Sequence, residues 1–566
     1  MQNKIQCPFS SNKEPCAEYR AGKYYFIEER IFLFSAVFLL IIAPLFLISH
    51  AIKQGIGFEF APVFLIGWIA TLLLMIFFYE HAINSKFINI MTRKKMPLCG
   101  IFRVAYDVLC RPSVLLREID IERKAKYGDI YLSFFGLRPV VIATSSAAAG
   151  IISKDYVTYA KSDPRDLDMP FFYNWVGNNN VVLANGNRWR EIRQLIHPTL
   201  NKVDAFFPVM NKKALLFCEK IQEQINLEQD QAGVAKIALS RWLKALSLDV
   251  AGEALFGYDF NHLNEQSNPG IDATDYILNE IFNPLRLSFP VINKLPIASN
   301  KKLKNAMKLL DVLVSDMIAH YVLQKRNHSV SSDKNVLAML VESGETVHHD
   351  ELRNNILALV LASHETTQVS LSGVLYYLAK YSDWQNRLRD EAIALFPDME
   401  GFFSGVNDAQ DLKNTPYWKL KTFKNLDNFI LESLRLYSPL ANQNPRTTME
   451  SVEIVGYQIP KGATIIMNLH AIHVSESEWE NPMLFDPDRF NKGNRGNKYS
   501  FLPFGNGPRI CSGREFSIIE QKLVVCYLLQ RYEITLPNKD YTVPLKRYSF
   551  TGIPEDDFSL CFKNRR

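Results

Sequence analysis

The chain has 566 residues, of which 48% are hydrophobic and 22% charged, so it can bury a large core and is not an intrinsically disordered protein. Its formal net charge of +5 is small for this length, and charge therefore gives no indication of nucleic-acid binding. The 8 cysteines show neither a disulfide framework nor zinc-site spacing, which is typical of a protein in a reducing compartment.

Two uncharged apolar runs lie near the N-terminus, at residues 31–48 and 60–79. Each is about long enough to cross a bilayer as a helix. Either run could instead be a buried core helix, and the first could be a signal peptide. A long and largely polar segment precedes the first run, which argues against a signal peptide. We therefore expect one or two membrane spans.

Basic residues flank this pair of runs on both outer sides. They are Arg20, Lys23 and Arg30 before the first run, and Lys86, Arg93, Lys94 and Lys95 after the second. The short loop between the runs contains only Lys53 as a basic residue. The positive-inside rule then places both outer flanks in the cytosol. The predicted parts of the chain are then a cytosolic segment (1–30), a membrane anchor (31–80), a basic linker (81–96) and a cytosolic folded domain (97–566).

Helical patterns dominate the predicted domain, and it contains no low-complexity linker. The predicted helices are 115–127, 189–200, 212–227, 301–325, 351–381 and 422–437. The strand-like runs are 130–135, 140–143, 452–455 and 456–465. Many helices with a few segregated strands predict a mainly α fold with small β-sheets, an α+β architecture.

An arginine-rich segment, 186–193, is predicted to begin a helix. Trp189 and Arg193 are four residues apart and therefore share a helix face. Considered alone, this pattern is more typical of an amphipathic helix with a tryptophan in the core.

Polar residues interrupt the apolar run that begins at Ile356, in the order Ser363, His364, Glu365, Thr366 and Thr367. Burying a carboxylate and two hydroxyl groups is costly unless they have partners or a chemical role. A threonine hydroxyl can also bond back to a carbonyl and bend the helix. A local kink, a solvated stripe and a catalytic acid–hydroxyl pair are all compatible with this pattern.

Glu432 and Arg435 lie three residues apart on one predicted helix face, followed by the loop 485–490 (Phe-Asp-Pro-Asp-Arg-Phe). Such pairs are usually surface salt bridges. His470 and His473 have a spacing that could suggest a metal site. The run before them reads as a strand, however, so we favour a structural role for both.

Cys511 lies in a glycine-rich loop, 504–513 (Phe-Gly-Asn-Gly-Pro-Arg-Ile-Cys-Ser-Gly), before a predicted helix at 516–529. This layout suits a haem-thiolate site. Glycines allow close approach of the backbone, and backbone N–H groups can point at the sulfur. Arg509 can pair with a carboxylate such as a haem propionate. The alternative is a buried structural cysteine in a turn.

The loop resembles the Phe-x-x-Gly-x-Arg-x-Cys-x-Gly signature of the cytochrome P-450 family at every fixed position. Four preceding segments resemble other signatures of this family, in family order. They are Trp189/Arg193, Ala362–Thr366, Glu432/Arg435 and Pro487–Phe490. Two positions depart from the family pattern, because Ser363 replaces the usual glycine and Asp488 the usual glutamate.

The resemblance implies a cytochrome P-450 fold at 97–566 that binds haem b, with Cys511 as the axial ligand of the haem iron. Other residues implied in haem binding are Trp189, Arg193, Arg446, Arg509, Phe504 and Gly513. By the same resemblance, Thr366 would hydrogen-bond dioxygen and Glu365 would relay protons. Glu432, Arg435 and Arg489 would form a buried structural network.

The implied activity is that of a monooxygenase, which inserts one atom of O2 into a lipophilic substrate. No flavin or nicotinamide fingerprint occurs in the chain, so electrons from NADPH would come through NADPH–cytochrome P-450 reductase, with cytochrome b5 as a second candidate donor. The implied location is the endoplasmic reticulum membrane, with the domain in the cytosol. Two alternatives remain open: an isomerase or dehydratase of the same fold that needs no O2, and a non-catalytic haem protein.

Overall fold

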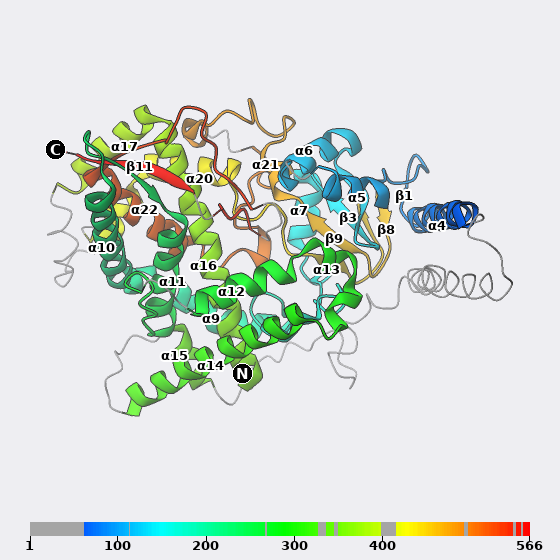
Figure 1. Ribbon diagram of the computed structural model, residues 1–566, viewed down its shortest axis with the longest axis horizontal. Coiled ribbons are helices and arrows are strands. Elements are labelled where there is room, and N and C mark those ends of the chain that lie inside the picture. The colour runs from blue at the N-terminus through cyan, green and yellow to red at the C-terminus, as the bar shows by residue number, and fades with distance from the viewer. Residues whose placement is uncertain are drawn as a thin grey trace, which may run out of the picture. The chain divides into compact units, whose positions relative to one another are not determined.

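The computed structural model describes residues 61–111, 114–265, 269–326, 335–343, 349–397, 415–491, 496–546, 551–555 and 558–565 (Figure 1). The predicted segment 1–30 and the predicted span 31–48 lie outside these residues. The chain groups into two compact units, each described here by itself. The first comprises Met1–Pro112, Arg123–Asp168 and Asn444–Met467, and the second comprises Ser113–Glu122, Met169–Gln443 and Asn468–Arg566.

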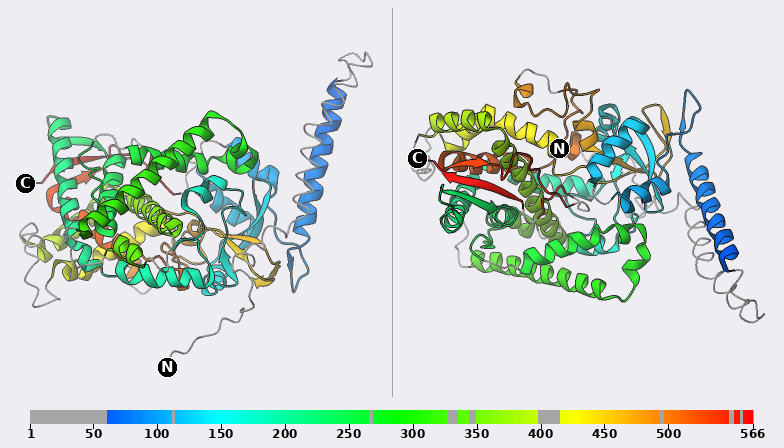
Figure 2. Two further views of the ribbon diagram at one scale, coloured as in Figure 1. Left: turned by 90° about the horizontal axis from the view of Figure 1, so that it is seen from below. Right: turned by 45° about the horizontal axis from the view of Figure 1, so that its top comes forward.

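The first unit begins with a long apolar helix, α4 (Ala61–Asn84). Figure 2 shows it as a single straight helix that projects from its own unit. Its segment Ile66–Asn84 is long and apolar enough to cross a membrane, and only 11% of that segment is buried. The side chains of Leu74, Phe77 and Phe78 are exposed. The helix covers most of the predicted span 60–79 and continues to Asn84.

Two small sheets form the β part of the first unit. The five-stranded sheet has the order β2-β3-β9-β6-β4, with β3 and β9 parallel and the other neighbours antiparallel. The three-stranded sheet has the order β1-β8-β7 and is antiparallel. Their strands are β1 (Ile88–Asn89), β2 (Ile130–Phe135), β3 (Arg138–Ala143), β4 (Tyr159–Lys161), β6 (Arg446–Thr448), β7 (Val452–Ile454), β8 (Tyr457–Ile459) and β9 (Thr464–Met467).

The single strand predicted at 456–465 was wrong, because β8 and β9 are separate strands in different sheets. Pro460 ends β8, since proline has no N–H to donate to the ladder. Gly462 then turns the chain with a φ of 82°, a conformation that glycine adopts without strain.

The second unit is mostly helical. Its helices are α8 (Pro170–Val176), α9 (Gly186–Leu200), α10 (Val203–Glu228), α11 (Ser240–Phe256), α12 (Pro269–Ile281), α13 (Pro284–Ser288), α14 (Ala298–Arg326), α15 (Val336–Glu342), α16 (His349–Lys380), α17 (Ser382–Leu395), α19 (Pro416–Thr422), α20 (Lys424–Leu436), α21 (Leu469–His473) and α22 (Arg514–Arg531). An antiparallel sheet with the order β10-β11-β5 completes it, from β10 (Tyr532–Thr535), β11 (Ser559–Asn564) and β5 (Val234–Ala238). The predicted mainly α fold with small sheets is confirmed.

Helix α16 is the central helix of the second unit and packs against α11, α20 and α22 (Figure 1). Its apolar residues after Ile356 are buried on several faces, as an interior helix requires. Polar contacts fix its position. The Ser247 hydroxyl of α11 donates to the His364 carbonyl at 3.0 Å, and the Ser370 hydroxyl donates to Gln521 of α22 at 2.6 Å.

Candidate active site

The loop before α22 folds tightly around Cys511. Gly505 and Gly507 have φ angles of 69° and 70°, in the left-handed region that favours glycine. A β-carbon on Gly505 would also lie 2.8 Å from the Gln443 amide nitrogen. The Cys511 N–H donates to the Phe504 carbonyl at 2.9 Å, which closes the loop. Gly505 and the signature residue Gly507 therefore allow the backbone turns that present the cysteine.

The Cys511 thiol lies deep in the protein, and this burial raises its pKa. A hydrogen bond from the Gly513 backbone N–H, together with the charges of Arg193 and Arg514, acts in the opposite direction and favours the thiolate. Despite its depth, the Cys511 residue is solvent-accessible. A deeply placed thiol that receives an N–H donor, on a residue that is itself exposed, fits a ligand that faces a bound group.

Two arginines and a tryptophan meet beside this loop. The Arg509 guanidinium lies 3.9 Å from the centre of the Trp189 ring of α9 and donates to the Ala184 carbonyl at 2.5 Å. Arg193, one turn after Trp189, donates to the Ser512 hydroxyl at 2.9 Å, and burial lowers its pKa. The structure thus brings the predicted haem-binding residues of α9 and of the Cys511 loop together.

The middle of α16 is accessible, although the segments of the helix before and after it are buried. Ala362 is exposed and Thr366, one turn later, is partly exposed. The Thr366 hydroxyl donates back to the Ala362 carbonyl at 2.6 Å. The Ser363 hydroxyl, at the position of the family glycine, donates to the Leu359 carbonyl at 2.8 Å. Both hydroxyls are therefore satisfied by their own helix.

Glu365 is buried, with 2% of its surface exposed. Burial raises the pKa of its carboxyl to about 7, although a hydrogen bond from Thr551 acts against this shift. The Thr551 hydroxyl donates to Glu365 Oε2 at 3.0 Å. A carboxyl group with this pKa can bind and release a proton near neutral pH.

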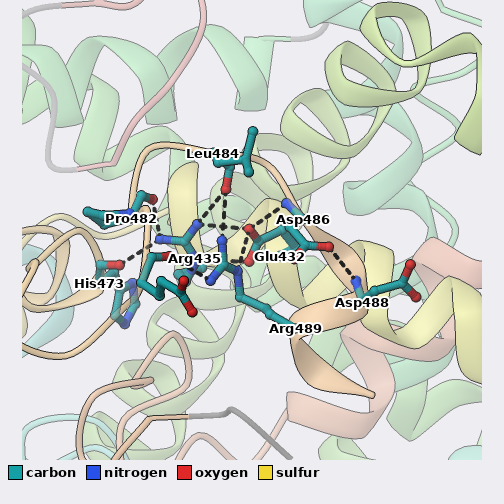
Figure 3. Close-up of polar contacts among 9 residues, drawn as sticks. Glu432, Arg435, His473, Pro482, Leu484, Asp486, Asp488 and Arg489 are labelled. Atoms are coloured by element: carbon teal, nitrogen blue, oxygen red, sulfur yellow. Dashed lines mark hydrogen bonds and ion pairs between the residues drawn. The ribbon is translucent and has the colours of Figure 1, made fainter. Parts of the chain in front are cut away.

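The Glu432, Arg435 and Arg489 side chains form a buried network (Figure 3). Arg435 donates to both Glu432 oxygens at 2.8 Å, and Arg489 donates to Glu432 Oε1 at 2.9 Å. The Asp486 N–H donates to the same oxygen at 2.9 Å. Neither Glu432 nor Arg435 is exposed.

Backbone carbonyls complete this network. Arg435 also donates to the carbonyls of His473, Pro482 and Leu484, at 2.9, 2.6 and 3.1 Å (Figure 3). These bonds tie α20 to the segment around α21 and to the loop before the 3₁₀ helix η6 (Pro487–Phe490). The network therefore has the contacts of a structural clamp.

Asp488 lies outside the network. Its carboxylate accepts from the Asn491 amide at 2.9 Å and lies 3.5 Å from Arg387, and its side chain is 38% exposed. Its departure from the family glutamate therefore leaves the buried ion pairs untouched.

His470 and His473 lie on α21 and are both buried. Burial lowers the pKa of each to about 3, so both are neutral. His473 Nε2 accepts from the Leu502 N–H at 2.9 Å. No group of three or more His, Cys, Asp or Glu residues able to hold a metal ion occurs in the described part of the chain. These contacts agree with a structural role.

Arg446 belongs to the first unit, in β6. It is buried, and this lowers the pKa of its guanidinium to about 10. It donates to the Tyr159 carbonyl at 3.1 Å, but its Nε has no hydrogen-bond partner among the residues described. A buried guanidinium left in this state fits an anionic partner such as a haem propionate.

Three contacts of the candidate site could not be anticipated from sequence motifs. They involve Ser512, which binds Arg193, Ser517, which lies 3.3 Å from the Thr367 hydroxyl, and Thr551, which binds Glu365. Serine and threonine carry no signal of their own, whether in a loop, as for Ser512 and Thr551, or on a helix, as for Ser517 of α22. Thr551 is 186 residues from Glu365 in the chain, so only the fold reveals their contact.

Comparison with known proteins agrees with this geometry. The family model "Cytochrome P450" matches residues 113–562. Cytochrome P450 3A16 of Mus musculus is 27% identical over 447 residues, covering 76% of this chain and 84% of the relative. Cytochrome P450 3A13 of Mus musculus is 27% identical over 518 residues (88% and 95%). Cytochrome P450 3A5 of Homo sapiens is 28% identical over 449 residues (76% and 84%). The chain belongs to the cytochrome P450 family and is a haem-thiolate monooxygenase.

Proposed function

We propose that this protein inserts one oxygen atom of O2 into a lipophilic small molecule, while the other atom becomes water. The observation that carries this proposal is the Cys511 thiol, which lies deep in the protein on an exposed residue and receives the Gly513 N–H. The haem, when bound, supplies the chemistry of O2 activation.

Cys511 is the proposed iron ligand of haem b. Its surroundings favour the thiolate, because the Gly513 N–H and the Arg193 charge both oppose the effect of burial on its pKa. Trp189, Arg193 and Arg509 are proposed to hold the propionates, since they adjoin the Cys511 loop. Arg446 is proposed as a further propionate partner on the basis of its unsatisfied Nε.

Glu365 and Thr366 are the proposed proton-handling residues. The pKa of Glu365 is about 7, so near neutral pH it is present in both protonated and ionised forms. Thr366 lies at the accessible point of α16, where its hydroxyl can exchange its bond to Ala362 for one to a substrate or a water molecule. This arrangement suits delivery of protons to the accessible face of α16.

Electrons from NADPH are proposed to arrive through NADPH–cytochrome P450 reductase, with cytochrome b5 as a second donor. The supporting observation is the lack of a nucleotide-binding fingerprint in the sequence. The exposed apolar helix α4 and the flanking basic residues support anchoring in the endoplasmic reticulum membrane with the catalytic domain in the cytosol. Such an anchor places the enzyme where lipophilic substrates concentrate.

The alternative activity, peroxide rearrangement without O2 or reductase, needs no proton relay. Glu365 and Thr366 are therefore evidence against it. A non-catalytic haem protein would also have no use for a buried acid with a pKa near 7.

The first test is the carbon monoxide difference spectrum of the dithionite-reduced protein. A strongly red-shifted Soret band is expected from thiolate ligation by Cys511. The second test measures NADPH oxidation with added reductase. We expect this oxidation to depend on a lipophilic substrate and to yield an oxygenated product. Haem-loaded, folded protein without the shifted band would refute the ligand assignment and the monooxygenase proposal with it.

A further inference from the structure

The accessible stretch in the middle of α16 lies beside the Cys511 loop. The buried Thr367 hydroxyl is 3.3 Å from the hydroxyl of Ser517, in the first turn of α22. That turn follows the loop directly, and the Ser517 N–H donates to the Gly513 carbonyl at 2.9 Å. A small molecule that reaches the accessible face of α16 is therefore held next to the segment that carries Cys511.

This accessible face carries two hydroxyl groups beside an alanine. Ser363 and Thr366 are three residues apart and Ala362 and Thr366 four apart, so the three side chains lie on one side of the helix. Ala362 is exposed, and Ser363 and Thr366 are partly exposed. The two hydroxyl groups are the polar atoms that the face presents to a bound molecule.

Both hydroxyl groups donate to carbonyls of their own helix. The Ser363 hydroxyl donates to the Leu359 carbonyl at 2.8 Å, and the Thr366 hydroxyl donates to the Ala362 carbonyl at 2.6 Å. A hydroxyl has one proton to donate and two lone pairs that accept. Since a carbonyl oxygen only accepts, each proton is directed at the helix backbone. The lone pairs remain for a bound molecule, so these two groups present hydrogen-bond acceptors.

The Ser363 proton is held by more than one carbonyl. Besides Leu359, the Val360 carbonyl lies 3.2 Å from the Ser363 oxygen. The family signature has glycine at this position, and glycine would supply no side-chain atom at all. The Ser363 oxygen is therefore an acceptor that this chain adds to the site.

Another acceptor lies at the Cys511 loop itself. The Gln443 side chain packs against Gly505, where a β-carbon would lie 2.8 Å from its amide nitrogen. The Gln443 Oε1 atom is buried and has no hydrogen-bond partner among the residues described. Burying an amide oxygen is costly unless a donor reaches it. This oxygen, like that of Ser363, is suited to a molecule that brings a donor.

We propose that Ser363 is a substrate-binding residue, and that the substrate is a lipophilic alcohol whose hydroxyl group donates a hydrogen bond to the Ser363 oxygen. This inference rests on the proposed function and names its substrate class. A ketone, an ether or a carboxylate has no proton to donate to an acceptor. An ammonium group would need a carboxylate to offset its burial, and the Glu365 carboxyl is bonded to Thr551 instead. A neutral hydroxyl group meets both conditions.

The test compares two rigid probes, 2-adamantanol and 2-adamantanone, which share a skeleton and differ only in a hydroxyl or a carbonyl group. Their dissociation constants are measured from the Soret spectrum of the ferric, haem-loaded protein. The wild type should bind the alcohol about fivefold more tightly, the fold-change that one net neutral hydrogen bond gives. Equal affinities, tighter binding of the ketone, or no binding of the alcohol up to its solubility limit would overturn the proposal.

Substitutions at position 363 assign the preference to its hydroxyl group. Ser363→Ala keeps the β-carbon and should reduce the preference for the alcohol to less than about twofold. Ser363→Thr retains the hydroxyl and should retain the preference. Ser372→Ala is the matched control, because it removes a fully buried hydroxyl that donates to the Gln368 carbonyl of the same helix. An unchanged preference in Ser363→Ala would overturn the assignment.

Turnover with added reductase gives a second readout. Ser363→Ala should raise the KM for 2-adamantanol relative to that for 2-adamantanone, whereas a merely structural residue would change both alike. All variants are first checked for the red-shifted carbon monoxide band. Its absence in the wild type refutes the proposed function. Its presence in a wild type without a preference for the alcohol refutes this inference alone.

Discussion

The Glu432 network and the Cys511 loop both place polar groups deep in the second unit, but only the network is closed. All three guanidinium nitrogens of Arg435 donate to the Glu432 carboxylate or to backbone carbonyls, so the chain itself supplies every partner. Neither Arg435 nor Glu432 is exposed. Cys511, by contrast, is accessible despite its depth.

The exposure of Cys511, compared with the full burial of Glu432 and Arg435, distinguishes a functional sequence signature from a structural one. Buried charges are tolerated where the protein itself supplies all partners. A deep group that the chain leaves accessible, or a buried carboxyl with a pKa near 7, is suited to a partner that arrives from outside. The motifs look alike as sequence, since each is a short run with one or two charged or reactive residues. Their surroundings distinguish them.

The largest effect is expected for Cys511→Ser. Serine does not ionise at neutral pH, so the red-shifted band of the reduced carbon monoxide complex and the oxygenase activity should both be abolished. Cys526→Ala is the control, because Cys526 is fully buried in α22 and should keep the band. A shifted band that persists in Cys511→Ser would mean that another residue is the ligand.

Arg435→Ala should have the largest effect on stability. It removes two hydrogen bonds to the buried Glu432 carboxylate and leaves Arg489 as the remaining arginine of the network, which costs about 3–5 kcal/mol of unfolding free energy. Arg387→Ala breaks an exposed ion pair with Asp488 and should cost less than about 1 kcal/mol. Denaturant unfolding gives the loss of unfolding free energy in each of the two variants. Equal losses would show that Arg435 contributes no more to stability than an exposed ion pair does.

Residues close in sequence were the predictable part of this molecule. The helices expected at 301–325 and 351–381 correspond to α14 and α16, because apolar periodicity and helix ends are local signals. The Cys511 loop was identified for the same reason, since its glycines and cysteine lie within one turn-forming segment.

Contacts between distant segments were not predictable. Thr551 and Glu365 meet only because the C-terminal segment returns to α16, and no residue pattern near Thr551 signals this. Likewise, the sequence indicates strands around 456–465 but not that β8 and β9 pair in different sheets, which depends on β1 and β3 far upstream. The closure of the Glu432 network also depends on the carbonyls of Pro482 and Leu484, which carry no side-chain signal.

Thr366→Ala should separate oxygen consumption from product formation. NADPH oxidation is expected to continue, while the product formed per NADPH falls about tenfold or more, the scale of one general acid–base contribution. Stability should change little, because the hydroxyl bonds only its own helix carbonyl. Thr367→Val, which removes the buried neighbouring hydroxyl beside Ser517, should remain coupled. Unchanged coupling in Thr366→Ala would contradict its role in proton delivery.

The smallest effect is expected for Asp488→Glu, which restores the family residue. Asp488 touches Asn491 and Arg387 at the surface and none of the buried ion pairs, so the unfolding free energy should change by less than about 0.5 kcal/mol. Asp486→Ala is the informative neighbour, because the Asp486 carboxylate accepts from the Asp488 N–H at 3.0 Å and begins η6. Loss of that cap should cost about 1 kcal/mol, still well short of Arg435→Ala. If Asp488→Glu stabilised the protein by several kcal/mol, the residue at position 488 would have to belong to the buried Glu432 network.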